Sequence, residues 1–291
     1  MEPMHPAAHR WVDSTDGVAV ALHDLGGDGP PLLLAHATGF AGRIWEPVQA
    51  HLTGWRCLAF DARGHGATRT PETADLSWLR VADDVLAAVD GFGLQGCVAA
   101  GHSMGAAALL LAELARPGTF RALYCYEPVT SPIDTDEPLR DLALAEMTLR
   151  RRDRFPSRDA ARANFAVKPP FDACTPAGLD AYLDHCWVPT GNPADATELT
   201  LACSRENEAT FYRLGRAHGL YERLGGVSCP VVVAAGIVEP GAPSSFATRV
   251  AERLPQARLL RYDDLGHFGP QQDPARIAAD LDAALRPWTG R

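Results

Sequence analysis

The chain has 291 residues, 46% of them hydrophobic, and a formal net charge of −9 at pH 7. This length suffices for one α/β domain with an insertion and a large buried core. Phosphate binding rests on lysine and arginine, and the one basic run of this acidic chain lies at 150–154, so we expect no nucleic-acid partner. No stretch of about 20 apolar residues is present, so we expect no membrane span. The first residues lack a basic segment followed by an apolar one, which argues against a secretory signal.

Seven cysteines make an odd number, and no two of them form a Cys-x-x-Cys pair. Four lie in or beside apolar, strand-like runs, where a thiol behaves as a small hydrophobic side chain: Cys57, Cys97, Cys125 and Cys229. We therefore expect neither a disulfide framework nor a zinc site, and we expect no metal and no cofactor. A reducing, cytoplasmic location fits this cysteine usage best.

Short apolar runs alternate with amphipathic segments along most of the chain. The expected strands are a hairpin at 11–24 and runs at 32–35, 56–60, 96–101, 120–126, 231–235 and 257–262. The expected helices cover 44–52, 77–91, 104–116, 244–254 and 274–286. Strands that alternate with helices and read as fully buried predict an α/β fold with a parallel sheet covered on both faces.

One segment, 132–224, interrupts this alternation. It opens with Pro132 and shows no convincing strand, and its helical patterns lie near 137–152, 158–166, 176–186 and 204–219. We interpret residues 1–131 and 225–291 as the core and 132–224 as a helical cap over the site. The alternative is a peripheral decoration away from the site.

The run 97–106 combines a short apolar stretch with Gly-His-Ser-Met-Gly at 101–105, and an Ala/Leu-rich segment follows. The pattern predicts a strand, a very tight turn that carries Ser103, and a helix that begins at once. The flanking glycines let strand and helix pass close together, and the helix N-terminus favours developing negative charge. We interpret Ser103 as a nucleophile; the alternative is a structural turn.

Further motifs occur in a fixed order around this turn. They are His-Ala-Thr-Gly-Phe at 36–40, Asp-Ala-Arg-Gly-His-Gly at 61–66, the serine motif, the helical insertion, and Gly-His-Phe at 266–268. From about residue 12 to residue 286 the chain resembles the α/β-hydrolase superfamily, and within it capped bacterial members such as esterases, dehalogenases, epoxide hydrolases and cofactor-free haloperoxidases. The resemblance implies a mostly parallel sheet of about eight strands with an inserted helical cap. Dehalogenases and epoxide hydrolases use an aspartate nucleophile, so Ser103 argues against both.

A histidine is needed to take the serine proton, and His267 follows the last expected core strand, where the superfamily places its general base. The triad acid is ambiguous, because two glutamates follow core strands. Glu239, after the expected strand 231–235, matches the position that the triad acid more commonly has in the superfamily, where it is usually an aspartate. Glu127, after 120–126, matches the placement of some dehalogenases, and a carboxylate at that buried strand end needs a partner. We favour Glu127 and keep Glu239 as the alternative.

The resemblance also implies an oxyanion hole made of the backbone N–H groups of Thr38 and Met104. Aromatic side chains that could line an apolar pocket are Trp45, Phe165, Phe171, Tyr182, Trp187, Phe211 and Tyr212.

Three functions remain open. The first is hydrolysis of a carboxylic ester, thioester or lactone through an acyl-serine intermediate. The second is a cofactor-free perhydrolase or haloperoxidase that uses the same triad with peroxide as acyl acceptor. The third is a non-catalytic small-molecule receptor. In each case the partner is a small molecule, and the sequence leaves the oligomeric state open, a homodimer included.

Overall fold

A computed structural model describes residues 10–130, 138–190, 198–215 and 217–290. The outer ends of the expected core, 1–9 and 291, and the expected start of the cap at 132 lie outside these residues. The main sheet has eight strands in the order β1-β2-β4-β3-β5-β6-β10-β11. Their bounds are β1 Arg10–Asp13, β2 Ala19–Gly26, β3 Pro31–Ala35, β4 Arg56–Phe60, β5 Cys97–His102, β6 Phe120–Tyr126, β10 Val231–Ala235 and β11 Ala257–Arg261.

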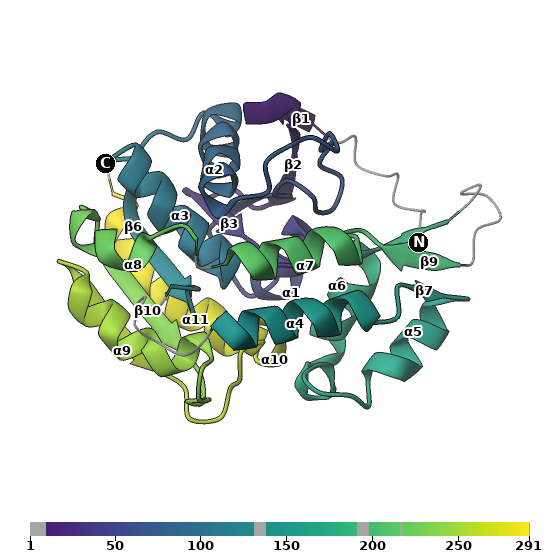
Figure 1. Ribbon diagram of the computed structural model, residues 1–291. Coiled ribbons are helices and arrows are strands. Elements are labelled where there is room, and N and C mark those ends of the chain that lie inside the picture. The colour runs from purple at the N-terminus through teal and green to yellow at the C-terminus, as the bar shows by residue number, and fades with distance from the viewer. Residues whose placement is uncertain (1–9, 131–137, 191–197, 216, 291) are drawn as a thin grey trace.

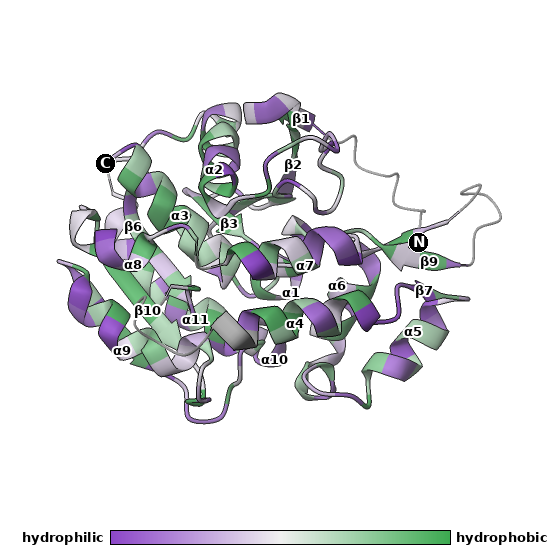
Figure 2. Ribbon diagram, viewed as in Figure 1, coloured by the Kyte–Doolittle hydropathy of each residue, from purple (hydrophilic) through white to green (hydrophobic). Residues whose placement is uncertain are grey.

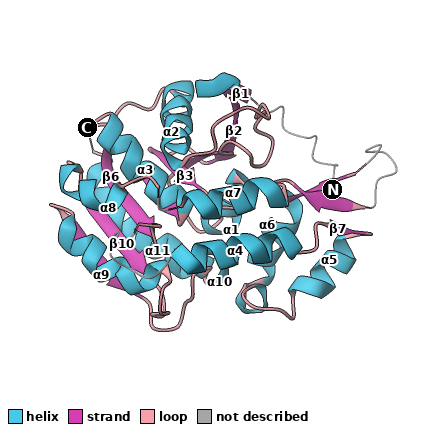
Figure 3. Ribbon diagram, viewed as in Figure 1, coloured by secondary structure: helices cyan, strands magenta, loops and turns pink. Residues whose placement is uncertain are grey.

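The six strands from β4 to β11 in this order run parallel, whereas β1 and β2 add an antiparallel edge. The expectation of a mostly parallel sheet of about eight strands is therefore confirmed. Helices lie in front of and behind the sheet (Figure 1, Figure 3). Those outside the segment between β6 and β10 are α1 Glu46–Gln49, α2 Trp78–Phe92, α3 Met104–Ala115, α9 Pro243–Arg253, α10 Gly269–Gln272 and α11 Pro274–Leu285.

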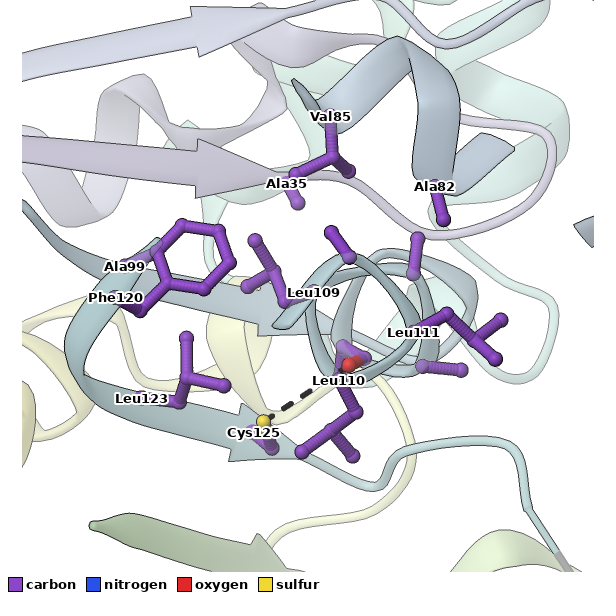
Figure 4. Close-up of a cluster of buried hydrophobic side chains, with 14 of the residues drawn as sticks. Ala35, Ala82, Val85, Ala99, Leu109, Leu110, Leu111, Phe120, Leu123 and Cys125 are labelled. Carbon is purple, nitrogen blue, oxygen red and sulfur yellow. Dashed lines mark hydrogen bonds between the residues drawn. The ribbon is translucent and has the colours of Figure 1, made fainter. Parts of the chain in front are cut away.

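Each strand divides its side chains between two apolar layers, because neighbouring residues point to opposite faces. Leu33 lies in one buried cluster with residues of α2, α3 and α9, whereas Leu32 and Leu34 lie in another with residues of α1 and α11. Figure 4 shows the first layer, in which Leu109 and Leu110 of α3 lie next to Phe120 and Cys125 of β6. Figure 2 shows α3 coloured as apolar along most of its length, as expected of a helix that is buried nearly throughout.

The close approach of β3 to α3 depends on Gly105. A Cβ atom at this position would lie 2.4 Å from the carbonyl oxygen of Ala35 and 2.6 Å from that of His36. Because both atoms belong to the backbone, neither can move without displacing the strand end.

We expect Gly105→Ala to lower the free energy of unfolding by about 1–3 kcal/mol, as overpacking of a close-packed core does. Urea denaturation measures this change. Gly225→Ala is the matched control, because a Cβ there would meet no atom within 4 Å. An equal effect of both variants would contradict this account of Gly105.

The segment between β6 and β10 contains α4 Pro138–Arg150, α5 Arg158–Phe165, α6 Pro176–His185, α7 Arg205–Leu214 and the short α8 Leu220–Arg223. The first four match the expected patterns, although residue 137 lies outside the described residues. The expectation of no strand was wrong. A small antiparallel sheet in the order β7-β9-β8 is formed by Arg154–Phe155, Leu199–Leu201 and Trp187–Pro189. Strands of two or three residues are too short to show alternation, so no sequence pattern predicts them.

The expected helix at 44–52 is shorter and of mixed type. Gly42–Trp45 forms a 3-10 turn, and α1 follows it. None of the helices in the described ranges combines the length and the apolar character that a membrane crossing requires.

Candidate active site

Ser103 lies at the turn between β5 and α3, in a backbone conformation that L-residues rarely adopt, with φ 55° and ψ −114°. A Cβ on Gly101 would meet the backbone of Ala106 at 2.6 Å, so the turn can be this tight only with glycine at 101. The Ser103 N–H donates to the carbonyl oxygen of Tyr126 at 2.9 Å. This bond fixes the serine against the end of the neighbouring strand β6.

His267 lies between Ser103 and Glu127. Its Nδ1 is 2.6 Å from Oε2 of Glu127, and its Nε2 is 3.2 Å from Oγ of Ser103. A carboxylate can only accept, so Nδ1 carries the proton and Nε2 is left to accept from the serine hydroxyl. The loop that carries His267 is held by the Tyr126 hydroxyl, which donates to the carbonyl oxygen of Gly266 at 2.7 Å.

Glu127 directly follows β6, and its side chain is 1% exposed. Its φ of 45° turns the chain at the strand end. Oε1 accepts from the backbone N–H of Gly236 at 2.9 Å while Oε2 binds His267. Both carboxylate oxygens are thus occupied, as a buried charge requires.

Glu239, the alternative acid, is exposed and lies in the loop after β10. Its backbone N–H donates to Oγ of Ser244 at 3.1 Å. Between the described side chains of Glu239 and His267 there is no hydrogen bond or ion pair. Of the two glutamates, the structure places Glu127 against His267.

Thr38 and Met104, the two expected oxyanion-hole residues, lie in the loop after β3 and at the start of α3. Met104 is the first residue of α3, so its N–H has no acceptor within the helix. Thr38 belongs to the loop after β3 and lines the same cavity as Ser103. The next residue, Gly39, has φ 77° and donates its N–H to Nε2 of His65 at 3.0 Å.

His65 supports this loop in one defined tautomer. Its Nδ1 donates to the carbonyl oxygen of Arg63 at 2.9 Å, so Nε2 is an acceptor for Gly39. Burial, with a smaller contribution from nearby His36, lowers the pKa of His65 to about 3. The ring therefore remains neutral, and keeps its acceptor, throughout the range in which a free histidine would gain a proton.

His102 is the last residue of β5 and directly precedes Ser103. It is buried, and its ring centre is 4.9 Å from that of His267. Burial lowers the pKa of His102, and the neighbouring His267 adds to the effect. The imidazole of His102, which packs next to that of His267, is therefore uncharged.

A cavity of about 560 Å³ opens above Ser103. It lies between the loops at the carboxyl ends of the core strands and helices α4, α6 and α7 of the inserted segment. Of the aromatic residues expected to line a pocket, four do so: Phe165, Phe171, Tyr182 and Tyr212. The segment between β6 and β10 thus contributes directly to the walls of this cavity.

Trp45, Trp187 and Phe211 lie elsewhere, contrary to expectation. Trp45 and Trp187 are buried in the layer on the α11 side of the sheet, and Phe211 is buried in the layer on the α3 side. Phe211 packs on His65 with ring centres 4.9 Å apart. Aromatic character cannot distinguish a pocket wall from a core position, and these three side chains stabilise the framework around the cavity.

Sequence reasoning also missed several lining residues. Apolar walls come from Phe40, Trp78, Val129, Leu144, Phe246 and Phe268, and polar groups from Arg151 and Glu208. Phe40 and Phe268 belong to the motifs at 36–40 and 266–268, so their position after core strands could have indicated that they line the cavity. Arg151 and Glu208 come from separate parts of the insertion, and nothing in the sequence pairs them.

The seven cysteines are all free. Within the described ranges, no group of three or more His, Cys, Asp or Glu side chains is arranged to hold a metal ion.

The sequence profile of the alpha/beta hydrolase family matches residues 32–280. The chain belongs to this family. This alpha/beta hydrolase is 27% identical over 292 residues to the non-heme chloroperoxidase of Streptomyces lividans, with 94% of this chain and 99% of the relative covered. It is 26% identical over 266 residues to the putative non-heme bromoperoxidase BpoC of Mycobacterium tuberculosis, with 88% and 93% covered. The protein is thus an enzyme of the hydrolase class, with haloperoxidases among its relatives.

Solved structures agree with the alpha/beta hydrolase fold. E-2-(acetamidomethylene)succinate hydrolase superposes with a TM-score of 0.77 at 19% identity and covers 96% of this chain and 98% of its own. A thermophilic esterase from Thermogutta terrifontis gives 0.73 at 19% identity, with 98% and 100% covered. At this identity the likeness concerns the fold.

Proposed function

We propose that this enzyme cleaves a carboxylic ester, thioester or lactone through an acyl-serine intermediate. The observation that carries the proposal is the unbroken series of contacts from Ser103 Oγ to His267 Nε2 at 3.2 Å and from His267 Nδ1 to Glu127 Oε2 at 2.6 Å. This series lies at the floor of a cavity large enough for a small substrate. Nucleophile, base and orienting acid are thus within reach of one another.

In the first half of the proposed reaction, His267 takes the Ser103 proton as the serine oxygen attacks the carbonyl carbon. The carbonyl oxygen becomes an oxyanion, which the N–H groups of Thr38 and Met104 stabilise. His267 then returns the proton to the leaving alcohol, thiol or ring oxygen. In the second half, His267 activates water, which releases the acid and restores Ser103. Glu127 stabilises the imidazolium in both halves.

Two measurements test this proposal. A fluorophosphonate probe should label the wild-type enzyme rapidly at Ser103, identified by peptide mass spectrometry. A panel of p-nitrophenyl esters from C2 to C12, run beside a set of lactones, should reveal turnover and the preferred acyl length. Absence of both labelling and turnover would reject the acyl-serine mechanism.

A second activity deserves a test because of the Streptomyces lividans and Mycobacterium tuberculosis relatives. If peroxide replaces water as acyl acceptor, the acyl-enzyme yields a peracid, which can oxidise halide. The test is halogenation of a dye. This reaction would be established if halogenation requires both peroxide and a carboxylic acid and is absent in Ser103→Ala. Hydrolysis without any such halogenation would show that water is the acyl acceptor and peroxide is not.

The pH dependence of hydrolysis tests the proposed base. His267 accepts a proton only when its ring is neutral, so kcat/KM should fall tenfold per pH unit on the acid side, as loss of one proton-accepting group predicts. The residual activity of His267→Gln should lack this limb. A profile that is flat from pH 5 to 8 would contradict the assignment of His267.

A further inference from the structure

A polar cluster lies in the wall of the cavity, and the proposed reaction does not use it. It consists of Arg151, which follows α4, Glu208 and Tyr212 on α7, and Tyr182 on α6. All four side chains line the cavity that contains Ser103. The Glu208 side chain is 6% exposed and that of Arg151 is 23% exposed, so the pair is largely removed from solvent.

The contacts within the cluster leave hydrogen-bonding capacity over. Arg151 donates from Nη1 to Oε2 of Glu208 at 2.7 Å and from Nη2 to the Tyr182 hydroxyl at 2.5 Å. The Tyr212 hydroxyl reaches Oε1 of Glu208 only at 3.5 Å. A guanidinium has five N–H groups and a carboxylate about four acceptor positions. These contacts do not use all N–H groups of Arg151 or all acceptor positions of Glu208, and the remaining ones can bind a ligand.

An ion pair in this place needs a reason other than stability. Replacing a buried ion pair with apolar side chains of similar volume is often neutral or stabilising. The walls of the cavity are largely apolar and include Phe40, Leu144 and Phe165. Apolar side chains in place of the ion pair would therefore match the rest of the wall. Fixed charges that line a substrate cavity are best explained by a ligand group that they bind.

The cluster is close to the loop proposed to stabilise the oxyanion. A Cβ atom on Gly39 would lie 2.7 Å from Oε1 of Glu208. Gly39 directly follows Thr38, whose N–H is one of the two proposed oxyanion donors. A substrate group only a few atoms from the reacting carbonyl would therefore reach Glu208.

The charges of the cluster select the kind of group. A carboxylate would be attracted by Arg151 but repelled by Glu208, and an ammonium would meet the opposite conflict. A neutral group that both donates and accepts satisfies the two side chains together. We propose that Arg151 and Glu208 form a subsite for a neutral hydroxyl or carboxamide group of the substrate, near the reacting carbonyl. This inference rests on the proposed ester hydrolysis.

Matched esters test the subsite in the wild-type enzyme. The p-nitrophenyl esters of 3-hydroxybutanoate and 3-methylbutanoate have nearly the same shape, and only the first can bind both side chains. We expect kcat/KM to be about 10- to 100-fold higher for the hydroxy ester, as hydrogen bonds to charged groups predict. The p-nitrophenyl monoester of succinate should be the poorest of the three. Equal rates for the first two, or a preference for the succinate ester, would overturn the proposal.

Paired variants assign the preference to the cluster. In Arg151→Met/Glu208→Leu the ratio of hydroxy to methyl ester should fall to near one. The control Arg158→Met/Asp184→Leu removes a more exposed ion pair that joins α5 to α6 and does not line the cavity, so its ratio should remain that of the wild type. A preference that survives in the first double variant would overturn the proposal.

Glu208→Gln covers the case in which the double variant does not fold. This change keeps the shape of the side chain and leaves Arg151 with its charge uncompensated. We expect the succinate monoester to improve at least tenfold relative to the methyl ester, because the repulsion is gone while the cation remains. No improvement would contradict the proposed balance of charges.

Binding to Ser103→Ala separates the subsite from the reaction. This variant cannot form an acyl-serine, so the dissociation constants of methyl 3-hydroxybutanoate and methyl 3-methylbutanoate report recognition alone. Tighter binding of the hydroxy ester supports the subsite even if fluorophosphonate labelling of the wild type fails. Equal binding overturns the subsite even if labelling succeeds.

Discussion

Ser103→Ala is expected to abolish turnover, leaving less than about 1% of wild-type kcat, because no other atom of the proposed triad can form the acyl intermediate. Alanine keeps the Cβ atom of serine, so the strain of the positive φ at this position is unchanged. The hydroxyl itself contacts His267 in the cavity rather than the apolar core. The melting temperature should therefore stay within a few degrees of the wild type.

Steady-state rates with the best p-nitrophenyl ester and a thermal melt measure both parts of this expectation. Ser77→Ala is a suitable control, because that hydroxyl binds Asp75 on the surface and lies outside the cavity. Activity of Ser103→Ala clearly above the 1% level would indicate another nucleophile or direct attack by water. A collapse in melting temperature would indicate that the turn depends on the hydroxyl.

Glu127→Gln is expected to lower kcat by about 10²–10⁴, since the imidazolium loses its charged partner and its tautomer is no longer fixed. The amide keeps the shape of the carboxylate and can still accept from the Gly236 N–H, so the fold should tolerate the change. Burst kinetics with a p-nitrophenyl ester would show whether acylation, deacylation or both are slowed.

Glu239→Gln is the matched comparison, with the same chemical change in a glutamate that also lines the cavity. It should cost less than tenfold in kcat, because its side chain does not contact His267. The reverse ranking of the two variants would show that the acid acts from the loop after β10 and that Glu127 has a structural role.

The sequence predicts the core strands and the longer helices well, because buried strands and amphipathic helices of this length leave clear periodic patterns. It also indicates the serine turn, since a strand and a helix can pass this close only with glycine at 101 and 105. The small sheet β7-β9-β8 has no comparable pattern. Its strands are defined by pairing across a long segment rather than by local composition.

The identity of the histidine's carboxylate partner could not be fixed from the sequence, because Glu127 and Glu239 both follow core strands. The structure distinguishes them through backbone contacts: the Ile237 N–H binds the carbonyl oxygen of Leu265 at 2.7 Å, and the Gly236 N–H binds Glu127. These contacts bring the end of β10 and the loop before His267 together at Glu127. No local sequence pattern predicts contacts between segments as far apart in the chain as the ends of β6 and β10 and the loop before His267.

The tie between Ser103 and β6 has a consequence for how this enzyme can change. Ser103 and Glu127 are fixed to each other by backbone hydrogen bonds of the central sheet, through the carbonyl oxygens of Tyr126 and Ala234. The loop at 237–242 and the inserted helices contribute walls of the cavity but none of these bonds. Natural variation or laboratory grafting can therefore exchange those walls for others and redirect the choice of substrate, while Ser103 and the buried carboxylate of Glu127 keep their spacing.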